Sequence, residues 1–209
     1  MSNQISFTEK AFAKVNLTLE ILGRRRDGYH NLASVMQTVD LFDTIEFSES
    51  DEVIVTCDDE EITPEINLAS KAASVLKQQA GITNGATMTI IKNIPVSAGL
   101  GGGSTDAAAA LRGLNKLWKL DLSLGELTEI GAEIGSDVPF LVRGGTSLVQ
   151  GRGEDVTPIP PAAVPKFLIL TPDVNLENPT AKTASVFSQV NESMFTRGSL
   201  THKLAARIR

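Results

Sequence analysis

Apolar and polar residues alternate from position 13 to position 21. A period of two is the pattern of a β-strand with one face towards a core, so we predict a strand here. Lys14 and Asn16 then project together from the opposite face of that strand. Other apolar runs predict extended segments at residues 34–47, interrupted near residues 40–43, and at 53–57, 87–91, 140–142, 146–150 and 167–170.

Helical spacing predicts three helices between these segments. Residues 68–79 carry apolar side chains three and four positions apart. Four consecutive alanines favour a second helix over about residues 104–118. Ser123 and Glu126 form the pattern of a capping box at the start of a third helix, which ends near Gly135. Because strands and helices follow one another in irregular order, the sequence predicts an α+β fold.

A proline-rich stretch divides the chain. Its prolines predict a linker or a crossing between domains, and they are Pro158, Pro160, Pro161 and Pro165. The predicted strand at residues 167–170 begins a new unit, but few residues follow to complete a sheet. We therefore expect one domain over residues 1–160 and the beginning of an incomplete second domain over residues 161–209.

Composition narrows the class of protein. The chain has 209 residues, of which 42% are hydrophobic and 21% charged, as in folded globular proteins. A net charge of −6 argues against a nucleic-acid-binding surface. One cysteine and two histidines argue against a disulfide framework and against a metal centre rich in either residue. The N-terminus is polar and no apolar stretch approaches ~20 residues, so we expect no signal peptide, no membrane span and a cytoplasmic location.

The segment Pro95–Thr105 is dense in glycine and leads into the predicted second helix. Its glycines, which let backbone approach a ligand closely and adopt positive φ, are Gly99, Gly101, Gly102 and Gly103. The unpaired N–H groups and the positive dipole end of a helix N-terminus attract phosphate. Ser104 and Thr105 add hydroxyl donors, and Asp106 adds a carboxylate near a possible Mg²⁺.

Three better-known glycine motifs do not fit this segment. The Walker pattern requires a lysine that the loop lacks. The dinucleotide fingerprint requires a small third residue where Ser104 stands and a βαβ context. A nucleophile elbow around Ser104 requires glycine at position 106, which is Asp106. A phosphate-binding loop of another kind is therefore predicted, and the alternative is a simple helix entry.

Three segments, in this order and spacing, resemble the GHMP kinase superfamily. The first is Ala13–Leu17 followed by Arg26–His30, the second is Pro95–Thr105 with Asp106–Ala108, and the third is Gly135–Phe140. The resemblance covers about residues 11–159. The Asp-Gly-Tyr-His sequence within the first segment is similar to the members that act on 4-diphosphocytidyl-2-C-methyl-D-erythritol.

The resemblance implies a GHMP kinase fold of the α+β class. Residues 1–160 would be its N-terminal, ATP-binding, ribosomal-protein-S5-domain-2-like domain, and residues 161–209 would begin its ferredoxin-like C-terminal domain. The implied activity uses ATP and Mg²⁺ to phosphorylate the 2-hydroxyl of 4-diphosphocytidyl-2-C-methyl-D-erythritol, in non-mevalonate isoprenoid precursor biosynthesis. The implied partner is this small molecule, with no nucleic acid and no membrane, and neither the Mg²⁺ ligands nor the oligomeric state is implied.

The resemblance also assigns site residues. Lys14 and Asp137 match the catalytic pair, and their chemistry agrees, because a carboxylate can accept the hydroxyl proton while an ammonium polarises that hydroxyl. Substrate contacts fall on Asn16, Tyr29 and His30, and nucleotide or substrate contacts fall on Asn67 and Lys92. The phosphate loop matches Pro95, Val96, Ser97, Ala98, Gly99, Leu100, Gly101, Gly102, Gly103, Ser104 and Thr105.

Two alternatives stay open. The protein could be another GHMP kinase, acting on mevalonate, homoserine or a sugar, and the Tyr29-His30 pair argues against this. It could instead be a truncated chain that binds nucleotide without turnover, because the third glycine-rich motif of the family has no match here. An aromatic residue that stacks on cytosine is expected after the strand at residues 167–170, and Phe187 is the nearby candidate.

Overall fold

A six-stranded sheet forms the centre of the protein in a computed structural model that describes residues 6–161, 166–170 and 182–208. Strands β1 (Ser6–Arg24) and β2 (His30–Ser50) form a long antiparallel hairpin. Along the other edge of β2, β4 (Gly85–Ile91) pairs with one half and β5 (Thr146–Gly151) with the other. Strand β3 (Val53–Cys57) then adds parallel to β4, and β6 (Asp155–Ile159) adds antiparallel to β5.

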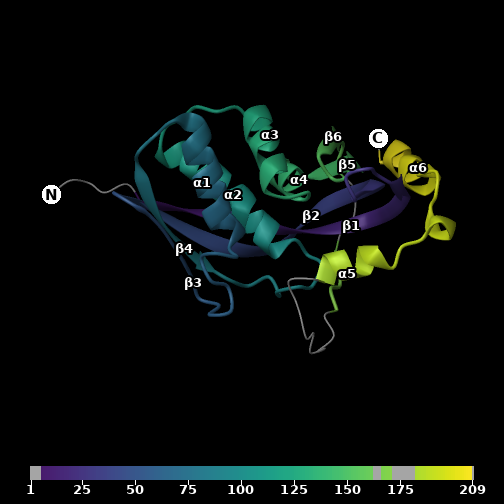
Figure 1. Ribbon diagram of the computed structural model, residues 1–209, viewed down its shortest axis with the longest axis horizontal. Coiled ribbons are helices and arrows are strands. Elements are labelled where there is room, and N and C mark those ends of the chain that lie inside the picture. Colours follow the sequence, from purple (N-terminus) through teal and green to yellow (C-terminus); the bar gives the residue numbers. More distant parts are fainter. Residues whose placement is uncertain (1–5, 162–165, 171–181, 209) are drawn as a thin grey trace.

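Four helices cover one face of this sheet (Figure 1). They are α1 (Leu68–Ala80), α2 (Gly102–Leu117), α3 (Leu124–Ile134) and α4 (Val138–Arg143). The alanines at 107–110 of α2 are fully buried, so this helix packs closely on the strands. Phe47 of β2 fills the space beside Gly113, where a Cβ atom would lie 2.2 Å from the phenylalanine Cζ. The main core therefore lies between the sheet and α1–α4.

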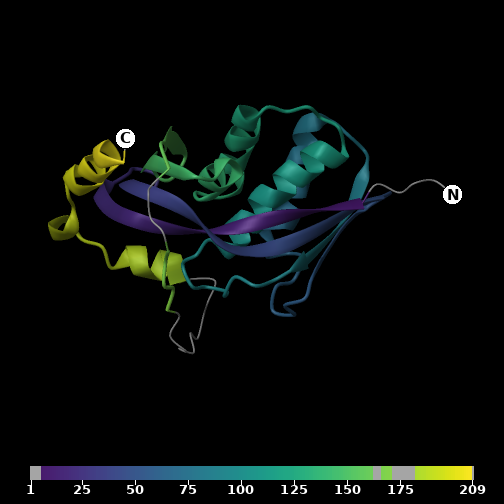
Figure 2. The same cartoon turned by 180° about the vertical axis from the view of Figure 1, so that it is seen from behind.

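The C-terminal elements lie elsewhere. Helix α5 (Lys182–Ser188) lies on the side of the sheet opposite to α1–α4 (Figures 1 and 2). The short 3₁₀ helix η2 (Glu192–Met194) leads to α6 (Ser199–Arg207), which packs on the β1–β2 hairpin. The buried carboxylate of Glu20 in β1 accepts a 2.7 Å hydrogen bond from the backbone N–H of Thr201 at the start of α6.

Much of the predicted secondary structure is confirmed. The fold is α+β, and the helices predicted at 68–79 and 104–118 are α1 and α2 within two residues at each end. Gly81 ends α1 in the left-handed conformation, with φ 64°. Ser123 and Glu126 form the predicted capping box of α3.

Four predictions about elements are wrong. The apolar run at 140–142 lies in the helix α4 and not in a strand. It is part of a run of five buried residues, 138–142, and periodicity does not distinguish a strand from a helix over so short a run. Pro139 also fits a first helical turn. Strand β2 continues through residues 40–43, where Phe42 and Asp43 pair with β1 beside a register shift between Phe12 and Lys14. Pro158 lies within β6, which tolerates proline as an edge strand. Residues 166–170 contain no strand, and the side chain of Leu168 is 86% exposed.

Candidate active site

The glycine loop connects β4 to α2 and presents the start of α2 without a side-chain cap. Gly101 is the N-cap residue and has φ 78°, and no side chain bonds to the helix there. A Cβ atom on Gly101 would lie 3.1 Å from Cγ of Lys14. Glycine is thus required both by the positive φ and by the close approach of Lys14. The free N–H groups of this helix end suit the phosphates of a nucleotide.

Lys14 and Asp137 form an ion pair beside this loop. The Lys14 Nζ lies 3.3 Å from Oδ2 of Asp137, and the lysine is buried. The backbone N–H of Lys14 donates a 2.9 Å hydrogen bond to the carbonyl oxygen of Leu100 in the loop. Asp137 stands at the N-cap position of α4, but its carboxylate makes no capping bond. The Asp137 carboxylate is therefore placed by the start of α4 without capping that helix, and it remains available to act on a substrate.

Asn16 and Ser34 orient the lysine. As predicted from the alternation, Lys14 and Asn16 share one face of β1, and the Lys14 ammonium donates to Oδ1 of Asn16 at 2.9 Å. The Asn16 amide donates in turn to Oγ of Ser34 at 2.7 Å, and that hydroxyl donates to the carbonyl of Thr18 at 2.6 Å. Sequence reasoning missed Ser34, because only the pairing of β1 with β2 brings it opposite this part of β1.

A buried cluster of charges lies beneath the first turn of α2. The Lys92 ammonium contacts Asp43 at 2.5 Å and Asp106 at 2.6 Å. A Cβ atom on Gly102 would lie 3.4 Å from Nζ of Lys92, so the ammonium sits directly under the loop. Asp43 also accepts the backbone N–H groups of Asn93 and Ile94, and so fixes the chain that leads into the loop.

Burial and electrostatic attraction act in opposite directions on the pKa values of Asp106 and Lys92 in this cluster. Burial raises the pKa of Asp106 to about 7, against the opposing attraction of the Lys92 ammonium. Burial alone would lower the pKa of Lys92, but its attraction to Asp106 and its hydrogen bonds to both carboxylates outweigh burial and raise it. The second oxygen of Asp106, Oδ1, is buried and has no hydrogen-bond partner. In this structure Asp106 therefore binds Lys92 rather than presenting a carboxylate to the loop.

Two predicted site residues have clear roles in the fold. The hydroxyl of Thr105 donates to the carbonyl of Phe12 at 2.7 Å and anchors α2 to β1. The side chain of Asn67 accepts from the N–H of Ala69 at 2.9 Å and caps α1. Both side chains are buried, so their predicted contacts with nucleotide stay predictions.

The turn between β1 and β2 brings Tyr29 and His30 to the far end of the hairpin. The His30 ring is buried, and it stacks on Phe187 of α5 with ring centroids 5.5 Å apart. Phe195 approaches the same ring edge-on at 6.3 Å. The Tyr29 side chain is half exposed, with a relative accessibility of 51%. The aromatic candidate Phe187 thus lies beside the predicted substrate-contacting histidine.

A family model and a solved structure show that the fold is that of a GHMP kinase. A structure of 4-(cytidine 5′-diphospho)-2C-methyl-D-erythritol kinase superposes with a TM-score of 0.63 and 34% identity, covering 74% of this chain and 55% of that one. Homoserine kinase from Cytophaga hutchinsonii gives a TM-score of 0.60 at 19% identity, covering 91% and 68%, which shows a shared fold alone. The model of the GHMP kinases N terminal domain matches residues 67–145, which include the glycine loop and Asp137.

Curated relatives identify the family. The 4-diphosphocytidyl-2-C-methyl-D-erythritol kinase of Caldicellulosiruptor saccharolyticus is 50% identical over 186 residues, 88% of this chain and 64% of its own length. The kinase of the same name from Dehalococcoides mccartyi is 43% identical over 196 residues, 94% of this chain and 68% of its own length. The chain belongs to the 4-diphosphocytidyl-2-C-methyl-D-erythritol kinase family. It spans about two thirds of the length of these two relatives.

The described part of the chain holds neither a membrane-spanning helix nor a metal cluster of protein ligands. None of its helices combines the length and apolar character needed to cross a bilayer. Among the same residues, no three His, Cys, Asp or Glu side chains come together around a possible metal ion.

Proposed function

We propose that this protein transfers the γ-phosphoryl group of ATP to the 2-hydroxyl of 4-diphosphocytidyl-2-C-methyl-D-erythritol. The observation that carries the proposal is the Lys14–Asp137 ion pair, 3.3 Å between Nζ and Oδ2, beside a glycine loop at an uncapped helix N-terminus. A donor phosphate and an acceptor hydroxyl both have complementary groups at this point. Relatives that bear this kinase name at 43–50% identity support the same conclusion.

Each group has a distinct task in the proposed reaction. The N–H groups at the start of α2 bind the phosphates of ATP. Mg²⁺, when bound with ATP, neutralises phosphate charge. The Asp137 carboxylate accepts the proton of the substrate hydroxyl, and the Lys14 ammonium polarises that hydroxyl. Asn16 accepts a hydrogen bond from Lys14 and so directs the ammonium.

The other end of the substrate is assigned to the hairpin turn. Tyr29 and His30 would contact the cytidine, because a neutral imidazole can hydrogen-bond the edge of the base and an aromatic ring can stack on its face. Phe187 stacks on His30 and would complete this subsite. We also propose that the N-terminal domain ends near residue 160, where β6 ends.

The proposal is tested by incubating the chain with ATP, Mg²⁺ and each of three acceptors in turn. The acceptors are 4-diphosphocytidyl-2-C-methyl-D-erythritol, mevalonate and homoserine, and ³¹P NMR detects a new phosphomonoester. We expect a product from the first acceptor alone. A product from mevalonate or homoserine would identify a different GHMP kinase. Binding of ATP without any product would assign the chain a nucleotide-binding role.

A further inference from the structure

Arg152 lies against the ring of Tyr29. Its guanidinium carbon is 5.2 Å from the centroid of the tyrosine ring, within the range of a cation–π contact. The same guanidinium donates a 2.9 Å hydrogen bond to the carbonyl oxygen of Ala132 in α3. One face of the Tyr29 ring is therefore covered by a cation that a helix holds in place, while about half of the side chain stays exposed.

The turn that carries Arg152 is fixed against the Asp137 segment. This turn, residues 151–154, joins β5 to β6. Gly153 has φ 127°, and a Cβ atom there would lie 2.5 Å from the carbonyl oxygen of Ser136, the residue before Asp137. Such a contact leaves no room for any other residue. The position of Arg152 is thus tied to the position of Asp137.

The same turn also contacts the hairpin turn through charged groups. Glu154 accepts a 2.6 Å hydrogen bond from the N–H of Arg152 and lies 3.8 Å from Nη1 of Arg25. The Arg25 guanidinium forms an ion pair with Asp27 at 3.0 Å, and the backbone N–H of Arg25 donates a 2.8 Å hydrogen bond to the backbone carbonyl of Tyr29. A cation–π contact and an ion pair therefore connect residues 151–154 to the turn that bears Tyr29.

We propose that Arg152 is a positioning residue for substrate specificity, which holds the Tyr29 ring as one wall of the cytidine subsite. The guanidinium occupies one face of the ring and leaves the other face for a stacked base. Because the turn of Arg152 also abuts Ser136, it sets the position of this wall relative to Asp137. This inference rests on the proposed function, since it requires a cytidine subsite at Tyr29.

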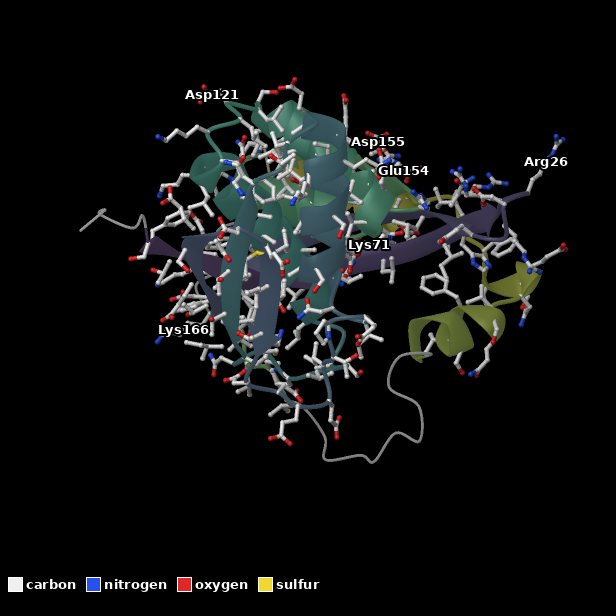
Figure 3. All side chains as sticks on the ribbon, turned by 60° about the vertical axis from the view of Figure 1, so that its left-hand side comes forward. Arg26, Lys71, Asp121, Glu154, Asp155 and Lys166 are labelled. Carbon is white, nitrogen blue, oxygen red and sulfur yellow. The ribbon has the colours of Figure 1, made fainter. Side chains whose placement is uncertain are left out.

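The test measures binding of cytidine 5′-diphosphate and, separately, of ATP by calorimetry with the whole chain. Arg152→Met keeps an apolar stem of similar length and removes the cation. The loss of an exposed cation–π contact should weaken cytidine 5′-diphosphate about two- to fivefold, with ATP affinity unchanged. Arg26→Met is the matched control, because Arg26 is exposed at the tip of the same hairpin and points away from the body of the protein (Figure 3). It should change neither affinity.

A double-mutant cycle tests the role of Arg152 separately from the existence of a cytidine subsite at Tyr29. In a Tyr29→Ala background, Arg152→Met should have no further effect on cytidine 5′-diphosphate binding. If Arg152→Met weakens cytidine 5′-diphosphate binding as much in the Tyr29→Ala background as in the parent chain, the proposed role of Arg152 is wrong. It is also wrong if Tyr29→Ala weakens binding and Arg152→Met alone leaves the affinity unchanged. If Tyr29→Ala itself leaves the affinity unchanged, the cytidine subsite of the proposed function is wrong.

A spectroscopic readout tests the contact without any ligand. Tyr29 is the only tyrosine in the sequence, so 3-fluorotyrosine gives a single ¹⁹F resonance that reports on this ring. We expect Arg152→Met to shift the resonance, Arg152→Lys to restore it in part, and Arg26→Met to leave it in place. Identical resonances in the parent chain and Arg152→Met would contradict the contact. A thermal unfolding transition in each variant shows that the protein is folded.

Discussion

The two ends of the candidate site are built in different ways. At the phosphate end, Lys14 is buried, bonded to the loop through its backbone and held by both Asn16 and Asp137 through its ammonium. At the hairpin end, Tyr29 is half exposed, and contacts from distant parts of the chain hold it. The phosphate end is thus fixed by the core, whereas the hairpin end depends on packing by turns and C-terminal elements.

This difference has a functional meaning. In the proposed function, phosphoryl transfer depends on fixed alignment, which the buried groups at the phosphate end would provide. Recognition of a substrate by stacking tolerates more adjustment, because an aromatic face has no strict register. Substitutions at the phosphate end should therefore act on the rate, and substitutions at the hairpin end should act on substrate affinity.

Asp137→Asn is the strongest test of the phosphate end. The amide keeps the shape of the side chain but cannot accept the proton, so we expect turnover to fall by about 10²–10⁴. ATP affinity should stay nearly the same, because Lys14 keeps its hydrogen bond to Asn16. Turnover is measured by product formation and ATP binding by calorimetry. Activity within threefold of the parent chain would remove Asp137 from the catalytic role.

The phosphate end could largely be predicted from the sequence. The alternation of residues 13–21 placed Lys14 and Asn16 on one face, and the structure confirms this with a 2.9 Å hydrogen bond. The glycine-dense segment leads into α2 as predicted, but its positive φ angles fall on Ser97, Gly99 and Gly101, whereas Gly102 is already helical. Periodicity could not separate these roles, because they depend on where the helix begins.

Other features depend on contacts that a sequence pattern does not contain. Asp43 is a fully buried acid in an apolar strand, and its partners Lys92, Asn93 and Ile94 are about fifty residues further along the chain. The contact between Arg152 and Tyr29 joins two turns that only the sheet brings together. These contacts join residues that are far apart in the sequence, so local sequence patterns could not predict them.

His30→Ala tests the hairpin end. Loss of one hydrogen-bonding partner of the base should weaken cytidine 5′-diphosphate binding by about 1–3 kcal/mol and leave ATP binding unchanged. His202→Ala is the matched control, because His202 is the other histidine of the chain and is exposed on α6. Calorimetry provides both affinities. Equal affinity for cytidine 5′-diphosphate in His30→Ala and the parent chain would show that His30 only packs between Phe187 and Phe195.

Two glycine substitutions test how strictly the loop is fixed. Gly101→Ala should reduce the free energy of unfolding by about 1–2 kcal/mol, because an alanine resists positive φ and its Cβ would press on Lys14. Gly103→Ala should increase it by about 0.5–1 kcal/mol, because this residue lies within α2 and a Cβ there meets only Leu68 at 3.7 Å. Urea denaturation measures both values. A Gly101→Ala variant as stable as the parent chain would mean that Gly101 is not required by backbone conformation.

The smallest expected effect concerns the anchoring of α6 to the hairpin. The Thr201 N–H holds the pKa of the Glu20 carboxyl below its ordinary value, although burial opposes this shift. The ionised carboxylate also complements the positive end of α6, whose N-cap residue Gly198 has no side-chain cap of its own. Because the folded pKa is lowered, this stabilisation is fully present above the ordinary pKa of 4.5 and is lost as the pH falls through the lower folded value. Glu20→Gln keeps an acceptor and removes the charge, so it should cost about 0.3–1 kcal/mol at pH 7.

Hydrogen exchange of the α6 amides measures this effect, because opening of one helix need not unfold the core. The parent chain should lose protection in α6 on acidification below pH 4.5 more steeply than Glu20→Gln, and the two proteins should converge at the lowest pH. Comparing the two proteins cancels the effect of the other carboxylates that titrate in this range. Exposed Glu129 on α3 offers a control, since Glu129→Gln should leave α6 exchange unchanged. Parallel pH profiles for the parent chain and Glu20→Gln would show that the carboxylate charge does not anchor α6, and that packing alone holds the C-terminal helix on the hairpin.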